Sequence, residues 1–216
     1  MNWLALETSS PLLSIALKKG NNKTEEFTFK GFLRHAENLL PAIDRLLKKK
    51  GLRVEAIDAF CIGRGPGSYT GLRIGFAALK GFLVLMEKPC YGAESLDIIA
   101  QSIPPQSSRP LVVCLDARQE KIYEKTYRFR KNAWRADGKI ESLSLKEFLR
   151  KLPEGASVTG DALKRYKKEI EQAGSAKRIF LLPEKFWYPR ASLLIQSPFL
   201  KQLKKPDDFL PLYRPC

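Results

Sequence analysis

The sequence has little of what metal centres and disulfide frameworks require. Its 216 residues include one histidine, His35, and four cysteines without any CxxC spacing, Cys61, Cys90, Cys114 and Cys216. Three of the cysteines lie in apolar, strand-like runs, where a thiol behaves as a small hydrophobe. A single histidine also excludes a nucleophile pair that needs a second imidazole. We therefore expect no zinc site, no other bound metal and no disulfide framework.

Long apolar runs are also missing. No stretch approaches the roughly 20 apolar residues that a helix needs to span a bilayer. The opening residues, MNWLALETSS, lack the basic segment and apolar core of a signal peptide. These absences predict a cytoplasmic protein.

Acidic residues are few relative to basic ones. The chain has 38 Lys and Arg against 23 Asp and Glu, a net charge of +15, and residues 111–216 hold 23 of the basic residues against 13 acidic ones. This imbalance attracts polyanions, although a solvated basic surface explains it equally. A tRNA-binding adaptor that acts through Lys164, Arg165, Lys167 and Lys168 stays open, but no aromatic RNA-binding motif accompanies these residues.

The most informative stretch is glycine-rich and covers residues 63–82, GRGPGSYTGLRIGFAALKGF. It follows an apolar run of strand length and precedes a segment of helical periodicity, which predicts a strand, a turn and a helix. Gly63, Gly65 and Gly67 alternate through the turn, so a ligand or another part of the chain should approach it closely. We expect Thr70 to cap the helix.

Two functions compete for this stretch. A phosphate site is disfavoured, because the spacing is GxGxxxG, no Gly-Lys-Ser/Thr follows, and Pro66 removes a backbone donor. Gly71, Gly75 and Ala78 instead form a stripe of small residues on which another helix can pack. The packing helix is expected to belong to a partner protein. A bulky side chain in place of Gly75 of this chain would then abolish pairing and leave the monomer folded. A helix pair within this chain fits the same stripe.

The remaining pattern repeats. Each half is expected to contain three strands, a helix, a strand, a helix, a strand and a helix, with residues 1–103 as the first lobe, 104–110 as a Pro- and Ser-rich linker and 111–216 as the second lobe. The first lobe has expected strands at 2–7, 12–18, 23–30, 57–62 and near 89–92, and helices at 35–50, after the glycine turn and from Ser95. The second has strands at 111–116, 121–129, near 134–140, 156–159 and 177–182, a capping box at Ser144 and Glu147, and helices at 161–173 and 190–203.

The motif GRGPGSYTGLRIG resembles the signature of the bacterial TsaB family, also called YeaZ, a paralogue of the catalytic TsaD subunit. The resemblance extends to Leu6–Ser10, His35–Pro41, Asp116–Arg118 with Glu120 and Tyr123, Gly160–Asp161 and Pro211–Arg214. The family more often carries Asp at the position of Glu7, and residues 161–209 are the least diagnostic. The resemblance implies an α/β protein with a duplicated actin-like (ASKHA) fold, two lobes that each combine a mixed sheet with helices.

The resemblance also implies a role. It is that of a non-catalytic scaffold, which binds and activates TsaD and works with the ATPase TsaE to transfer threonylcarbamoyl to N6 of adenosine 37 in tRNAs reading codons that begin with adenine. The chain alone is expected to bind no cofactor, whereas the complex uses ATP and threonylcarbamoyl adenylate. Contact with tRNA through the complex is left open, and a homodimer is expected to be accessible in isolation. The expected interface comprises Tyr69, Thr70, Gly71, Arg73, Ile74, Gly75, Ala78, His35 and Leu39.

The two turns that would clasp phosphate in such a fold lack glycine. They read Glu7-Thr-Ser-Ser-Pro11 and Asp116-Ala-Arg-Gln-Glu-Lys121. Glu7 and Asp116 would lie near the cleft of that fold and could hold a cation, but the expected role of both is capping or a salt bridge with Arg118. No catalytic or nucleotide-binding residue is therefore predicted. A self-sufficient ATP-binding enzyme of the same fold is the alternative.

Overall fold

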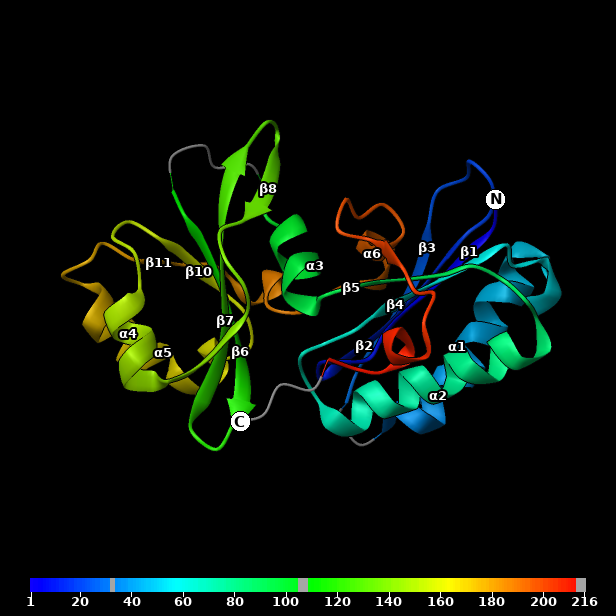
Figure 1. Ribbon diagram of the computed structural model, residues 1–216, viewed down its shortest axis with the longest axis horizontal. Coiled ribbons are helices and arrows are strands. Elements are labelled where there is room, and N and C mark those ends of the chain that lie inside the picture. The colour runs from blue at the N-terminus through cyan, green and yellow to red at the C-terminus, as the bar shows by residue number, and fades with distance from the viewer. Residues whose placement is uncertain (32–33, 105–108, 213–216) are drawn as a thin grey trace. The chain divides into compact units, whose positions relative to one another are not determined.

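The computed structural model describes residues 1–31, 34–104 and 109–212, and the chain divides into two compact units (Figure 1). The first unit contains residues 1–98 and a segment that begins at Pro189, and the second contains residues 99–188. Most of the predicted linker, residues 105–108, lies outside the described ranges, as does the end of the motif that starts at Pro211. Within those ranges, no helix has the length and apolar character to cross a membrane.

The first unit is built on a six-stranded mixed sheet in the order β12-β5-β4-β1-β2-β3. The β1, β2 and β3 strands form an antiparallel meander, while β4 runs parallel to β1 and to β5. The elements are β1 Trp3–Glu7, β2 Leu12–Lys18, β3 Glu25–Lys30, α1 His35–Lys50, β4 Ala59–Gly63, α2 Tyr69–Leu85, β5 Cys90–Ala93, α3 Ser95–Gln101, α6 Ala191–Leu194 and β12 Lys201–Gln202.

The two faces of this sheet carry different side chains because successive strand residues point to opposite sides. Leu4 and Leu6 of β1 pack in one core with the apolar faces of α1 and α2, which lie beside each other along the sheet (Figure 1). Ala5 points the other way, into a second core with Ala191 and Leu194 of α6. Large residues therefore face the two long helices, and small ones face α6.

The second unit repeats this order. Its sheet runs β11-β10-β6-β7-β8, with β9 paired to β7, so β6, β7, β8, β10 and β11 take the places of β1, β2, β3, β4 and β5. The elements are β6 Leu111–Arg118, β7 Lys121–Arg130, β8 Ala133–Ala136, β9 Glu141–Ser144, α4 Leu145–Lys151, β10 Ser157–Thr159, α5 Leu163–Gly174 and β11 Phe180–Leu181. The predicted fold class, a duplicated actin-like α/β architecture, is confirmed.

The C-terminal segment differs from the prediction. The helix expected at residues 190–203 is limited to the four residues of α6, and β12 follows it. The amide of Ala191 donates to Ser14 Oγ at 2.8 Å, and the amide of Leu203 donates to the Cys90 carbonyl at 2.8 Å. These contacts tie the segment to the first sheet, so it joins the first unit rather than the second lobe where the prediction placed it.

Candidate functional site

The glycine turn after β4 is packed against the turn that follows β1. A Cβ added at Gly63 would lie 1.8 Å from Glu7 Oε2, and one at Gly67 would lie 2.2 Å from the Ser9 carbonyl oxygen. The Ser68 amide donates to that same carbonyl at 2.7 Å. The groups that approach this turn closely are therefore the chain's own, the Glu7 carboxylate at Gly63 and the Ser9 backbone at Gly67.

The small-residue stripe on α2 continues the same contact. A Cβ on Gly71 would lie 2.1 Å from the Thr8 carbonyl oxygen, and one on Gly75 would lie 2.4 Å from Thr8 Oγ1. Both glycines are buried, and Ala78 is partly buried against the first core. The stripe thus closes onto residue 8 of this chain, and Gly71 and Gly75 are not available to a partner as predicted.

The start of α2 is also capped differently from the prediction. The helix begins at Tyr69, so Ser68 holds the N-cap position and its Oγ accepts the Gly71 amide at 3.1 Å. Thr70, the predicted cap, lies two residues further along the chain, inside the first turn of α2, and is exposed. A serine before the first helical residue is the signal that identifies this cap in the sequence.

The predicted interface residues of α1 are buried as well. His35 is 1% exposed, and its Nδ1 and Nε2 lie 2.9 Å and 3.0 Å from the carbonyl oxygens of Gly31 and Ser10. Leu39 packs in the first core. His35 therefore joins the start of α1 to the turn after β1, and neither residue reaches the surface of its unit.

The opposite side of α2 is uncovered. We call it the outer α2 face, and it consists of the exposed residues Tyr69, Thr70, Arg73, Ala77, Lys80, Gly81, Val84 and Leu85. Val84 and Leu85 are 85% and 82% exposed, and Tyr69 is 57% exposed with Arg73 Nη1 donating to its hydroxyl at 3.2 Å. Ile74 lies at the margin, half-buried.

Sequence reasoning found the first turn of this face and missed its second half. Ala77, Gly81, Val84 and Leu85 follow Arg73 at helical spacing, but apolar residues in a helix are usually assigned to a core. Only the packing of the other apolar residues, Phe76 and Leu79, against the sheet shows which side is left outside. On α1, which contacts α2, Leu40 is likewise 56% exposed.

The first clasping turn is occupied by a buried carboxylate. Glu7 Oε1 accepts the Ser9 amide at 2.8 Å, and Oε2 accepts the Ser95 hydroxyl at 3.2 Å. Burial raises the pKa of the Glu7 carboxyl above its ordinary value. The prediction that Glu7 caps its own turn is thereby confirmed, since its carboxylate accepts the Ser9 amide.

The corresponding turn of the second unit is arranged in a similar way. Asp116 Oδ1 accepts the Arg118 amide at 2.9 Å, and Arg118 Nη1 lies 3.7 Å from Asp116 Oδ2, as predicted. Asp161 Oδ1 accepts the Asp116 amide at 2.9 Å, and a Cβ on Gly160 would lie 1.9 Å from the Cys114 carbonyl oxygen. Burial, with a smaller contribution from Asp116, raises the pKa of Asp161 to about 6. Across the described ranges, no group of three or more His, Cys, Asp or Glu residues is placed to hold a metal.

These features define a duplicated actin-like protein whose clasping turns are satisfied by its own side chains. Residues 31–176 match the family model of TsaD, described as tRNA N6-adenosine threonylcarbamoyltransferase. In structure, the chain is similar to YeaZ from Pseudomonas aeruginosa, with a TM-score of 0.75, 25% identity and 91% of both chains covered.

Among curated proteins, the chain is similar to three tRNA threonylcarbamoyladenosine biosynthesis proteins TsaB. The protein of Haemophilus influenzae is 33% identical over 124 residues, which cover 57% of this chain and 52% of the relative. The protein of Escherichia coli is 33% identical over 129 residues, which cover 59% of this chain and 55% of the relative. The match thus spans about half the length of these two relatives. The protein of Buchnera aphidicola is 26% identical over 211 residues, 91% of each chain. The chain belongs to the TsaB (YeaZ) family, which is related to TsaD.

The contact between α2 and Thr8 predicts opposite effects of alanine at two glycines of one helix. Gly71→Ala should lower the free energy of unfolding by about 1–3 kcal/mol, because its methyl group meets a backbone carbonyl. Gly81→Ala, which meets no atom within 4 Å, should raise it by about 0.5–1 kcal/mol. Urea unfolding measures both, and equal effects of the two substitutions would contradict the packing described.

The environment of Asp161 predicts a pH-dependent stability difference. Because the folded-state pKa of about 6 lies above the ordinary aspartate value of 3.8, the folded state holds this proton more tightly. The associated stability is therefore lost as pH rises from 3.8 through about 6. Asp161→Asn keeps the acceptor for Asp116 and removes the titration. Its free energy of unfolding relative to the unmodified protein should therefore increase by about 2 kcal/mol between pH 4.5 and pH 7.5. Urea unfolding at both pH values measures this difference, and Glu169→Gln, at an exposed position of α5, is the control. A difference in the free energy of unfolding that does not change with pH would refute the prediction.

Proposed function

We propose that this chain is a non-catalytic subunit that binds a TsaD homologue through the outer α2 face and activates it for threonylcarbamoyl transfer to N6 of adenosine 37 in tRNA. The observation that carries the proposal is that Val84 and Leu85, apolar residues at one end of the outer α2 face, are left exposed in a chain whose family is related to TsaD itself. Contiguous apolar surface of this kind marks protein–protein contacts. TsaE would complete the complex in the cytoplasm, where tRNA is the substrate.

The chemistry of the outer α2 face suits a helix of a partner. Ala77 and Gly81 are small and allow a close approach, while Val84 and Leu85 provide apolar area at one end. Tyr69 and Arg73 stack at the other end, and both residue types are enriched at interface centres. Arg73 is the fifth residue of α2, near its N-terminus, where the helix dipole disfavours a cation, so an acidic group on the partner would stabilise it.

The clasping turns support a role without nucleotide chemistry for the isolated chain. In the first unit, the Ser9 amide is bonded to Glu7 and the glycine turn fills the space beside it. In the second, the Arg118 amide is bonded to Asp116. ATP and threonylcarbamoyl adenylate would therefore be handled by the complex, and this chain would contribute binding surface.

A charge in the middle of the outer α2 face should prevent assembly. We expect Ala77→Asp to weaken binding to a TsaD homologue about 100-fold, because the added carboxylate would lose its hydration in the contact. Copurification and titration calorimetry measure the loss, and Ala136→Asp, an exposed alanine of the second unit, is the matched control. Undiminished pairing of Ala77→Asp would remove this interface. Loss of a homodimer without any effect on TsaD binding would assign the face to self-association instead.

The isolated chain should not bind magnesium ATP. Titration calorimetry is expected to give no saturable heat, corresponding to a Kd weaker than about 1 mM. The reason is that the turn amides are already bonded to Glu7 and Asp116. A micromolar Kd would favour the alternative, a self-sufficient ATP-binding enzyme of the same fold, over the scaffold.

A further inference from the structure

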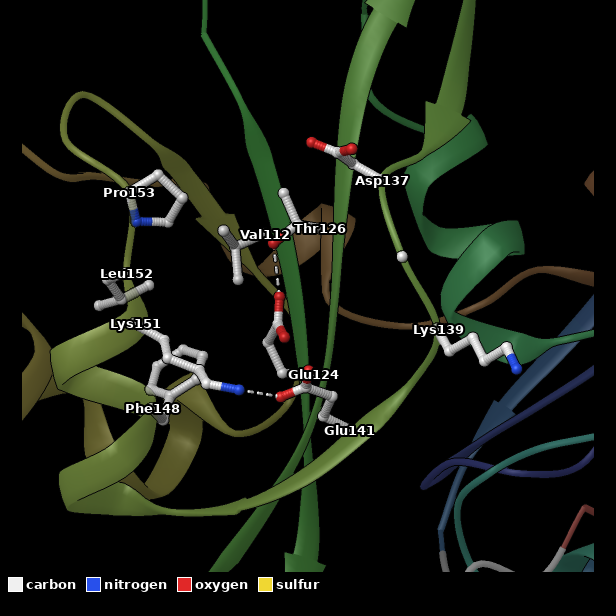
Figure 2. Close-up of a pocket in the computed structure, with 11 residues that line it drawn as sticks. Val112, Glu124, Thr126, Asp137, Lys139, Glu141, Phe148, Lys151, Leu152 and Pro153 are labelled. Carbon is white, nitrogen blue, oxygen red and sulfur yellow. Dashed lines mark hydrogen bonds and ion pairs between the residues drawn. The ribbon is translucent and has the colours of Figure 1, made fainter.

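The second unit contains a cavity of about 220 Å³ between the sheet and the end of α4 (Figure 2). One wall is apolar and is formed by Val112, Phe148, Leu152 and Pro153. The volume corresponds to about seven water molecules at about 30 Å³ each, which is enough for a small organic ligand and less than a nucleotide requires.

The charged residues that line this cavity are unequally paired. Glu141 forms an ion pair with Lys151, and Asp137 Oδ2 lies 2.6 Å from Arg128 Nε. Glu124 accepts only the Thr126 hydroxyl, at 2.6 Å, among the contacts of the described chain. In Figure 2 the Lys139 side chain extends away from Glu124. One carboxylate oxygen of Glu124 is therefore left for a ligand.

The strand register makes this carboxylate costly without a cation. Glu124 of β7 lies directly opposite Glu141 of β9, and like charges at such positions repel each other. Lys151 of α4 is the cation that faces both, and it contacts Glu141. On the other side, Glu124 is opposite Cys114 of β6, which supplies no positive charge. Burial, with Glu141 adding to it, raises the pKa of the Glu124 carboxyl.

We propose that this cavity binds a small organic cation, a primary ammonium on a short hydrocarbon chain, with the ammonium at Glu124 and the hydrocarbon against Val112, Leu152 and Phe148. The charge requirement comes from the opposed carboxylates of Glu124 and Glu141, and the hydrocarbon requirement from the apolar wall. A bare metal ion would leave that wall without a contact. This inference does not depend on the proposed pairing with TsaD.

The probe is n-butylammonium, with n-butanol as a neutral molecule of the same number of heavy atoms. Titrated into the full chain and followed by NMR, n-butylammonium should shift the amides of Glu124, Thr126 and Leu152 with a Kd on the order of 1 mM, and n-butanol should not. Glu124→Gln keeps the shape and removes the charge, so it should weaken binding about tenfold or more. Glu169→Gln, at an exposed position of α5, should bind n-butylammonium as the unmodified protein does.

Measurements on the unmodified protein keep the test decisive even if Glu124→Gln fails to fold. Binding should be weaker at pH 4.5 than at pH 7.5, because a protonated carboxyl no longer attracts a cation that stays charged at both pH values. The proposal is overturned by equal binding of n-butanol, by pH-independent binding, or by Mg²⁺ shifting these amides when n-butylammonium does not. An absence of saturation up to about 50 mM probe would overturn it as well.

Discussion

The contact on which the first unit depends is the close approach of the β4–α2 segment to residues 7–9. Glycine at 63, 67, 71 and 75 lets the segment lie against the Glu7 carboxylate and the Thr8 and Ser9 backbone at distances that no Cβ allows. The Ser68 amide and the His35 ring bond to Ser9 and Ser10 around it. The turn after β1 is thereby enclosed by α2 on one side and by the start of α1 on the other.

Two consequences of this contact bear on function. The turn after β1 is filled by the chain's own atoms, since Glu7 accepts the Ser9 amide and Gly63 and Gly67 lie against Glu7 and Ser9. The orientation of α2 is also determined, because its glycine side must face Thr8 and its Phe76 and Leu79 must face the sheet. The residues left outside form the outer α2 face. The contact with Thr8 and the exposure of the outer α2 face thus have the same physical origin.

The second unit repeats the arrangement with different residues. Gly160 approaches the Cys114 backbone as Gly63 approaches Glu7, and Asp116 caps its own turn as Glu7 does. The additional strand β9, which pairs with β7, has no counterpart in the first sheet. Its Glu141 lies opposite Glu124, so the cavity lined by these carboxylates is a feature that the duplication did not copy.

Local patterns in the sequence determined much of the fold. Strand-like runs separated by turn residues predicted the meander of β1, β2 and β3, and helical periodicity predicted α1 at its observed bounds. The Ser144 and Glu147 capping box opens α4 as expected. These features depend on residues a few positions apart, so short windows of sequence contain the necessary information. The motif around the glycine turn likewise identified the family.

Only the tertiary structure decided which surface each face of α2 meets. A stripe of glycines indicates a close neighbour without saying whether that neighbour is a partner helix or, as found, Thr8 at a separation of more than sixty residues. The same limit applies to His35 and to α6, whose place on the first sheet depends on its bonds to Ser14 and Glu26. The spacing of apolar and small residues predicts that a residue is buried. Which residue contacts it depends on long-range packing, which short windows of sequence do not contain.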